Sequence, residues 1–160
     1  AGRYTATWNT LALGQTADGY RMTHQFFKRL VTGDAGGDAP QNAIYRGRDQ
    51  QIAFRLIEAD KAGVAGLVEP YATALTLGDI GQLDVGYVAG GTVVGASKVL
   101  ILTAVTGTPA YIQAELTITL TYTILMENFP VEILYAPDLK EVPMRMRSYP
   151  ASTGIYGTVT

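Results

Sequence analysis

The sequence contains no cysteine and a single histidine, His24. Without cysteine the chain can hold neither a disulfide framework nor a thiolate metal site. A catalytic triad or a histidine-based metal centre would depend on His24 alone, and this residue lies in a strand-like segment beside Phe26 and Phe27, where a packed or surface histidine is the simpler interpretation. We therefore expect no catalytic residue, no metal site and no cofactor, and we do not expect an enzyme.

The sequence also lacks an excess of charge of either sign. Twelve Lys and Arg residues stand against 14 Asp and Glu residues, which gives a net charge of −2. Bulk neutralisation of nucleic-acid phosphates needs clustered Lys and Arg, so this balance argues against stable nucleic-acid binding. Arg46, Arg48, Arg145 and Arg147 could contact phosphate, but solvated strand faces explain them as well.

Long apolar segments are missing too. The longest uncharged run, Val99 to Ala114, is broken by Gly107 and Pro109 and is too short for a membrane helix. No N-terminal stretch has the basic, apolar and small-residue order of a signal peptide. We expect a soluble protein that is made in the cytoplasm and has no membrane partner.

The sequence does contain segments with the alternating pattern of β-strands. Its length is typical of one domain, so we predict a single domain over residues 1–160. In the best alternating segment, Ile52, Phe54 and Leu56 are predicted to point inward and Gln51 and Arg55 outward. We predict an antiparallel β-sandwich or barrel, with a turn at 14–19 and a mobile or extended C-terminal tail at 151–160. The predicted strands lie in the segments 3–13, 20–32, 43–59, 98–105, 115–126, 129–138 and 141–150.

Only one segment has a helical period. Asp60 is a plausible N-cap for a short helix over about residues 60–72, and Pro70 suggests an early end. This helix is predicted to flank the sheet through an apolar stripe with i, i+3, i+4 and i+7 spacing. The stripe consists of Val64, Leu67, Val68 and Tyr71.

The segment "ELTITLTYTILMEN" alternates apolar residues with hydroxyls and has no charge from Leu116 to Met126. Such a strand, high in β-propensity and low in charge, is an aggregation hazard on a free monomer. Taken alone, such a polar face is most often an ordinary solvated one, but the missing charge favours a strand that another subunit covers. That face consists of Thr117, Thr119, Thr121 and Thr123.

The segment Gly33–Asn42 is a loop by composition, rich in Gly, Asp and Pro. Asp34 and Asp38 could belong to a calcium loop, but the alternating oxygen ligands and terminal Glu of an EF-hand are missing. A turn with Asx hydrogen bonding is the better interpretation.

The motifs "LGQTADG", "TGDAGGDAP" and "FPVEILYAPDLKEVPMRMRSYP" follow one another in this order, and together they resemble the tail tube proteins of tailed bacteriophages. "LGQTADG" is similar to the Leu-Gly turn ending in Asp-Gly that follows the family's first strand. "TGDAGGDAP" is similar to the family's D-x-x-G-D-x-P arm, with a glycine several residues on. The segment "FPVEILYAPDLKEVPMRMRSYP" is similar to the family's closing strands. The arm residues that carry the resemblance are Asp34, Gly37, Asp38, Pro40 and Gly47.

The resemblance implies a virion structural protein. Such subunits close into hexameric rings that stack into a tube, and strands from all subunits line the lumen through which DNA passes without specific binding. With this resemblance, the face of Thr117, Thr119, Thr121 and Thr123 is expected to meet a confined space, either the lumen or a neighbouring subunit. Residues 33–47 would form an extended ring-stacking arm, and the helix near residues 64–71 would pack outside the barrel. Expected partners are further copies of the chain and other tail proteins such as terminator, sheath or baseplate components. The type VI secretion tube has the same architecture.

Two other classes stay open on sequence alone. One is another virion part, such as a capsid decoration or tail terminator protein. The other is a small β-sandwich ligand-binding module, for example for carbohydrate, which should expose clustered aromatic residues. The aromatic residues that could form such a cluster, Trp8, Tyr45, Tyr87 and Tyr111, are scattered in the sequence.

Overall fold

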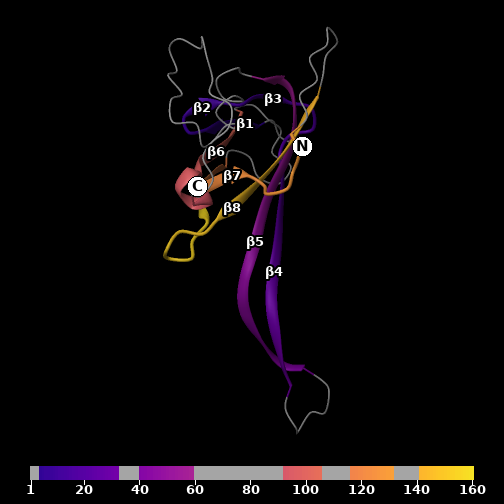
Figure 1. Ribbon diagram of the computed structural model, residues 1–160, viewed down its shortest axis with the longest axis vertical. Coiled ribbons are helices and arrows are strands. Elements are labelled where there is room, and N and C mark those ends of the chain that lie inside the picture. The colour runs from indigo at the N-terminus through magenta and orange to yellow at the C-terminus, as the bar shows by residue number, and fades with distance from the viewer. Residues whose placement is uncertain (1–3, 33–39, 60–91, 106–115, 132–140) are drawn as a thin grey trace.

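A computed structural model describes residues 4–32, 40–59, 92–105, 116–131 and 141–160 (Figure 1). The predicted helix at 60–72 lies outside the described residues, and so does most of the predicted strand at 129–138. The same holds for three of the arm residues and for the four residues of the helical stripe. Those seven residues are Asp34, Gly37, Asp38, Val64, Leu67, Val68 and Tyr71.

The described chain is mainly β, as predicted. Its strands pair antiparallel in the order β2-β1-β6-β7-β8-β5-β3, with β4 added to β5 and β9 added to β7. One short helix, α2, precedes β6 and is capped by the Thr92 side chain. The elements are β1 (Tyr4–Trp8), β2 (Leu11–Ala12), β3 (Gly14–Thr16), β4 (Arg21–Thr32), β5 (Pro40–Ala59), α2 (Val93–Ala96), β6 (Lys98–Ala104), β7 (Thr117–Leu125), β8 (Val142–Tyr149) and β9 (Gly157–Val159).

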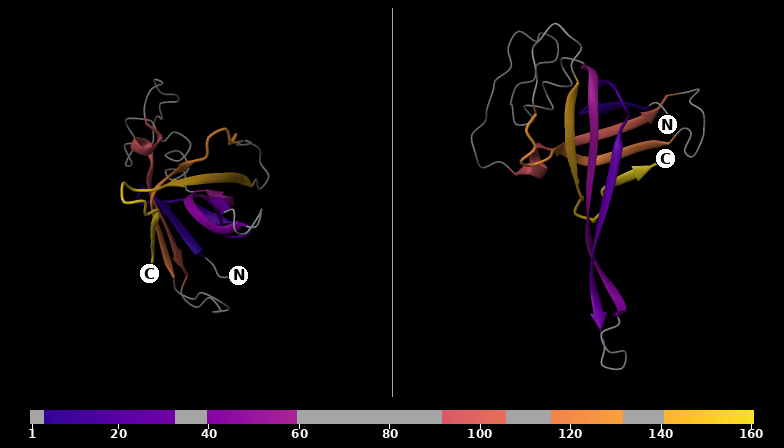
Figure 2. Two further views of the ribbon diagram at one scale, coloured as in Figure 1. Left: turned by 90° about the horizontal axis from the view of Figure 1, so that it is seen from below. Right: turned by 90° about the vertical axis from the view of Figure 1, so that its right-hand side faces the viewer.

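The sheet curls into a nearly closed barrel. Its two end strands, β2 and β3, are separated in sequence only by Leu13, whose side chain is fully buried and whose N–H donates to the carbonyl of Ala6 at 3.0 Å. Figure 2 shows β6, β7 and β9 running crosswise to β5 and β8. The turn predicted at 14–19 is shorter than expected, because Gly14–Thr16 pairs with the end of β5 as β3.

The core lies between these two sets of strands. The predicted alternation in β5 is confirmed: Ile52, Phe54 and Leu56 are buried, whereas Arg55 is exposed. Leu100 and Leu102 of β6, Leu120 of β7 and Met144 and Met146 of β8 complete the packing with Ala6, Trp8 and Leu13. Burial of such side chains contributes roughly 1.5–3 kcal/mol each, so this cluster supplies most of the stabilisation of the barrel.

Part of the segment predicted as a C-terminal tail, 151–160, belongs to the sheet: Gly157–Val159 forms β9, whereas residues 151–154 form a turn in which the Gly154 N–H donates to the Ala151 carbonyl. Thr158 pairs with Thr119, and the backbones of Thr117 and Thr160 exchange hydrogen bonds of 2.7 and 3.0 Å. Gly157 makes this pairing possible, because a Cβ at this position would overlap the carbonyl oxygen of Thr119 and lie 2.9 Å from the Cα of Leu120.

We predict that Gly157→Ala lowers the free energy of unfolding by about 1–3 kcal/mol, the usual cost of forcing a methyl group into packed backbone. Amide exchange should accelerate at Thr117 and Thr121, whose N–H groups donate to Thr160 and Tyr156. Urea denaturation and hydrogen exchange measure both effects. Thr158→Ala, in the same strand but exposed, is the control and should change stability little.

Tyr20 is a polar residue at the edge of the core. Its ring packs against Phe54 with centroids 5.1 Å apart, and its buried hydroxyl has no hydrogen-bond partner in the described part of the chain. Burial raises the pKa of Tyr20 from 10.0 to about 12. The folded protein therefore keeps this proton up to a higher pH than the unfolded chain does, so stability is lost as pH rises from 10 towards 12.

Tyr20→Phe should therefore stabilise the protein by about 1 kcal/mol at neutral pH, because it removes a buried hydroxyl without a partner. It should also flatten the loss of stability between pH 10 and 12. Thermal melts of both proteins across this range provide the measurement. A lower Tm for Tyr20→Phe at pH 7 would mean that the hydroxyl has a partner after all.

Candidate functional site: a projecting arm and a threonine-rich sheet face

A long hairpin projects from the barrel. We define the arm as Thr23–Thr32 of β4 together with Pro40–Asp49 of β5, which pair along their whole length. Figure 1 shows the arm extending well beyond the rest of the described chain. The neighbouring strand β8 pairs with β5 only from Gln50 onward, so within the described residues the outer edges of both arm strands have no strand partner.

The arm differs from the prediction in its extent. We expected an extended segment over residues 33–47, with Gly33–Asn42 as a loop. Pro40 and Gly47 instead belong to β5, and half of the arm is β4. Periodicity could not separate arm from barrel, because a strand segment that packs on nothing shows no clean alternation of apolar and polar residues.

Both faces of the arm are apolar and exposed. On the face that continues the core side, Phe26 and Tyr45 lie with ring centroids 6.5 Å apart. Phe27 and Ile44 lie on the opposite face, since Phe27 alternates with Phe26 and Ile44 is paired with Arg29. The exposed fractions are 57% for Phe26, 46% for Phe27, 61% for Leu30, 37% for Val31, 56% for Ile44 and 57% for Tyr45. Apolar clusters of this kind on a soluble protein mark an interaction surface.

The arm is also basic, although the whole chain is slightly acidic. Lys28, Arg29, Arg46 and Arg48 lie on it, and its one acidic residue within the described ranges, Asp49, is bound by Arg147 at 3.0 Å. A partner for this surface should therefore combine apolar area with negative charge.

A β-bulge twists the arm at its middle. The partner of β4 changes from Gly47 at Phe27 to Tyr45 at Lys28, which leaves Arg46 as the extra residue. Gly47 has a φ of +135°, which a side chain would strain. Bulges increase local twist, and the two strands are visibly twisted about each other in Figure 2.

The root of the arm is fixed to the barrel by side chains from outside the hairpin. The Tyr156 hydroxyl donates to the carbonyl of Arg48 at 2.6 Å, and the Arg48 guanidinium lies 4.5 Å from the centre of the Tyr156 ring. Arg147 of β8 binds both Asp49 and Glu127. Because these contacts hold the root, the direction in which the arm leaves the barrel is set by packing and ion pairing.

The second feature is the outer face of the sheet formed by β1, β6, β7 and β9. Register places Thr5, Thr103 and Thr117 in one row across this face, and Thr7, Ile101, Thr119 and Thr158 in the next. The only charged residue in these four strands is Lys98, at the first position of β6. We name this surface the threonine face; it consists of Thr5, Thr7, Thr103, Thr117, Thr119, Thr121 and Thr158.

Thr123 does not belong to the threonine face, contrary to the prediction. Its side chain is fully buried, and its hydroxyl lies 3.2 Å from that of Ser148. Its carbonyl accepts a hydrogen bond from the indole N–H of Trp8 at 2.9 Å. The alternation fails here because this end of β7 is covered on both sides, by the core and by α2.

Sequence reasoning identified three of the threonines and missed the other four. Thr117, Thr119 and Thr121 stood out because they share one strand. Thr5, Thr7, Thr103 and Thr158 come from three other strands, and only the strand register brings them together. The alternation of polar and apolar residues in these strands indicates which threonines point outward, but the sequence does not give the order of the strands in the sheet.

No protein-family model matches this sequence, and no curated protein matches it at a significant level. Within the described ranges, no helix is long and apolar enough to cross a membrane. In the same part of the chain, no three His, Asp or Glu side chains come close enough together to hold a metal ion. The arm and the threonine face are therefore the two candidate functional surfaces of the described residues.

Proposed function

We propose that the protein is a structural subunit of a bacteriophage tail tube. In this proposal copies of the chain close into rings, which are hexameric in the family that the sequence resembles, and the rings stack into a tube that conducts DNA during ejection. The subunit is made in the host cytoplasm and functions in the virion, with terminator, sheath or baseplate proteins as further partners.

The exposed arm is the observation that carries the proposal. Four of its apolar side chains are more than half exposed, and they lie on both faces of a two-stranded ribbon. An isolated two-stranded ribbon is marginally stable at best in water. Contact with another molecule on both faces would remove this apolar area from water, at roughly 25 cal/mol per Å².

The free edges of the arm favour further copies of the chain as that molecule. Edge strands that are long and apolar are templates for pairing with another strand, and soluble proteins usually protect them. A closed ring of subunits pairs or covers every such edge, as a barrel does. Within the described residues the net charge of the arm is basic, since Arg147 neutralises its acidic residue, Asp49.

The threonine face suits the wall of a DNA conduit. Each cation that neutralises a phosphate adds affinity through counterion release, and a wall that binds DNA would slow its passage. Hydroxyl groups are hydrated and uncharged, so they make the surface of the wall hydrophilic without binding the DNA. In the proposed tube this face lines the lumen, and the arm makes the contacts between subunits.

The carbohydrate-module alternative has no comparable support. Of the aromatic residues that could form a sugar-binding platform, Trp8 is buried in the core and Tyr45 lies on the arm. Tyr87 and Tyr111 lie outside the described residues.

Deletion of residues 34–38 tests the stacking part of the proposal. These residues lie in the segment that joins the two strands of the arm, so their removal shortens the arm and leaves the barrel unchanged. We expect rings to form and tubes to fail. Sedimentation velocity of the purified proteins at increasing concentration separates single rings from longer assemblies. If the deleted protein forms no rings, the segment acts within a ring and not between rings.

A further inference from the structure

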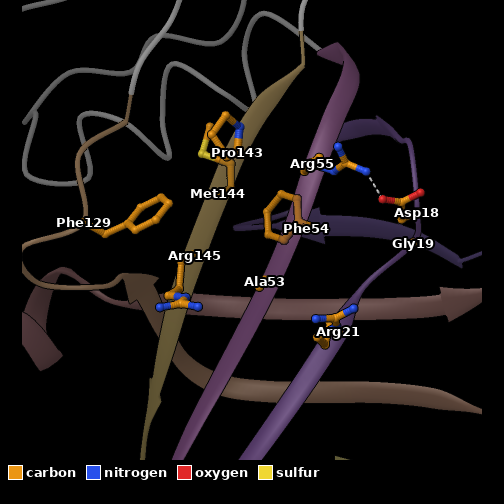
Figure 3. A pocket seen from close by; sticks show the side chains of 10 residues that line it. All are labelled: Asp18, Gly19, Arg21, Ala53, Phe54, Arg55, Phe129, Pro143, Met144 and Arg145. Carbon is orange, nitrogen blue, oxygen red and sulfur yellow. Dashed lines mark hydrogen bonds and ion pairs between the residues drawn. The ribbon is translucent and has the colours of Figure 1, made fainter.

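A basic groove crosses the outer side of the sheet at the root of the arm. It has a volume of about 440 Å³ and is lined by residues of β4, β5 and β8, by Asp18 and Gly19 before β4, and by Phe129. Register places Arg21, Ala53 and Arg145 side by side in one row across these strands. Figure 3 shows the two arginines on either side of Ala53, whose small side chain leaves the space between them open.

The arginines of this groove are not equivalent. Arg55 is bound by Asp18 and by Glu141, and the hydrogen bond that its guanidinium donates to Asp18 is the main cause of the raised pKa of Arg55. Arg21 and Arg145 are exposed, and neither forms an ion pair within the described part of the chain. The groove thus has two unneutralised guanidinium groups, two strands apart, which corresponds to about 10 Å between their backbone positions.

The chemistry of the groove favours a short acidic peptide over a nucleic acid. Guanidinium groups bind carboxylates in a bidentate manner. Two free cations are few for a polyphosphate, whose binding depends on many neutralised charges. Phe129 adds an apolar wall, with its ring centre 5.9 Å from the Arg145 guanidinium.

The chain itself contains a matching segment. Asp34 and Asp38 lie between the two strands of the arm, separated by Ala35, Gly36 and Gly37. Two residues four positions apart can be separated by up to about 13 Å, which is enough to span the two arginines. The small residues between them would fit over Ala53.

This segment cannot reach the groove of its own chain. The 12 residues of β4 separate Arg21 from Thr32 by about 36 Å. The covalent chain from Thr32 to Pro40 can extend back from the end of the arm by at most about 14 Å. Only a second copy can therefore bring Asp34 and Asp38 to Arg21 and Arg145.

We propose that the groove between Arg21 and Arg145 binds the acidic segment around Asp34 and Asp38 from the arm of a second copy of this chain. This inference rests on the proposed self-assembly and adds the docking site on the receiving subunit. In this contact the acidic segment at the end of one arm meets the basic groove of another copy. The charges therefore specify both the part of the arm that docks and the surface on which it docks.

The first experiment uses a peptide, so it does not depend on tube formation. A fluorescent peptide with the sequence of residues 30–42 is titrated with the full-length protein at low salt, below any concentration at which it assembles. The matched control peptide carries Asp34→Asn and Asp38→Asn. We expect at least 10-fold weaker binding for the control peptide, and an equal loss for the protein variant Arg21→Glu/Arg145→Glu. Equal binding of both peptides, or no binding up to the highest concentration at which the protein stays unassembled, would overturn the proposal.

The second experiment exchanges the charges in the assembling protein. Arg21→Glu/Arg145→Glu and Asp34→Arg/Asp38→Arg should each reduce the fraction of stacked rings at least 10-fold, and mixing the two variants should restore stacking. The control Gln15→Glu/Ser152→Glu adds negative charge at exposed sites outside the groove and should stack normally. Unchanged stacking in the charge-reversed variants would overturn this inference and leave the tube proposal intact. If the peptide binds to the groove but the protein forms no tubes, the tube proposal is overturned and this inference stands.

Discussion

Phe27→Asp/Ile44→Asp should abolish self-assembly and leave the monomer folded. Both side chains lie on one face of the arm and are 46% and 56% exposed, so the barrel does not depend on them. In an interface that buries the arm, each would act as an anchor whose loss costs about 2 kcal/mol or more, and the introduced carboxylates would add a desolvation cost. Together we expect the concentration needed for assembly to rise by about 100-fold or more.

Sedimentation velocity gives the assembly state of this variant, and a thermal melt of the monomer gives its stability. Two controls separate the effect of the arm from that of the substitution type. Phe27→Leu/Ile44→Val keeps the apolar surface and should assemble normally. Ile155→Asp places the same charge at an apolar residue that is 57% exposed but outside the arm, and it should also assemble normally. Normal assembly of Phe27→Asp/Ile44→Asp would mean that the exposed arm is not an interface.

Thr119→Lys should convert a tube that does not bind DNA into one that binds it. Thr119 is near the centre of the threonine face, between Ile101 and Thr158 in its row. In a ring of six subunits the substitution adds a circle of cations to the proposed lumen, and each phosphate that they neutralise increases the salt dependence of binding. We expect short duplex DNA to be retained by the variant tubes at low salt and released steeply as salt increases, whereas wild-type tubes retain none.

The control for this prediction is Ser152→Lys, which adds the same charge at an exposed turn position between β8 and β9. Thr119→Gln provides a side chain of similar size without charge. If Thr119→Lys prevents assembly while Thr119→Gln does not, the threonine face contacts a neighbouring subunit and does not line the lumen.

Much of the barrel could be predicted from the sequence because its strands have one buried and one exposed face. Ile52, Phe54 and Leu56 alternate with Gln51, Ala53 and Arg55 for this reason, and so do Met144 and Met146 with Arg145 and Arg147. The prediction was wrong where that condition does not hold. Thr123 is covered on both sides, so a hydroxyl that alternates with apolar residues is nevertheless buried.

The candidate surfaces were harder to predict, because each depends on pairing between distant segments. The threonine face combines β1 with β9, which are separated by nearly the whole chain. The arm was underestimated because Phe26 and Phe27 are consecutive, and in a strand consecutive apolar residues indicate burial on both faces. Here both faces are exposed in the single chain, which is the observation behind the proposed self-assembly.

Electron microscopy of the purified protein at high concentration tests the central claim most directly. We predict rings that stack into hollow tubes about the width of a phage tail, with the arm between subunits and the threonine face towards the lumen. The Phe27→Asp/Ile44→Asp variant imaged in parallel should show neither rings nor tubes. A wild-type protein that stays monomeric at all concentrations, with its apolar arm exposed, would contradict the account.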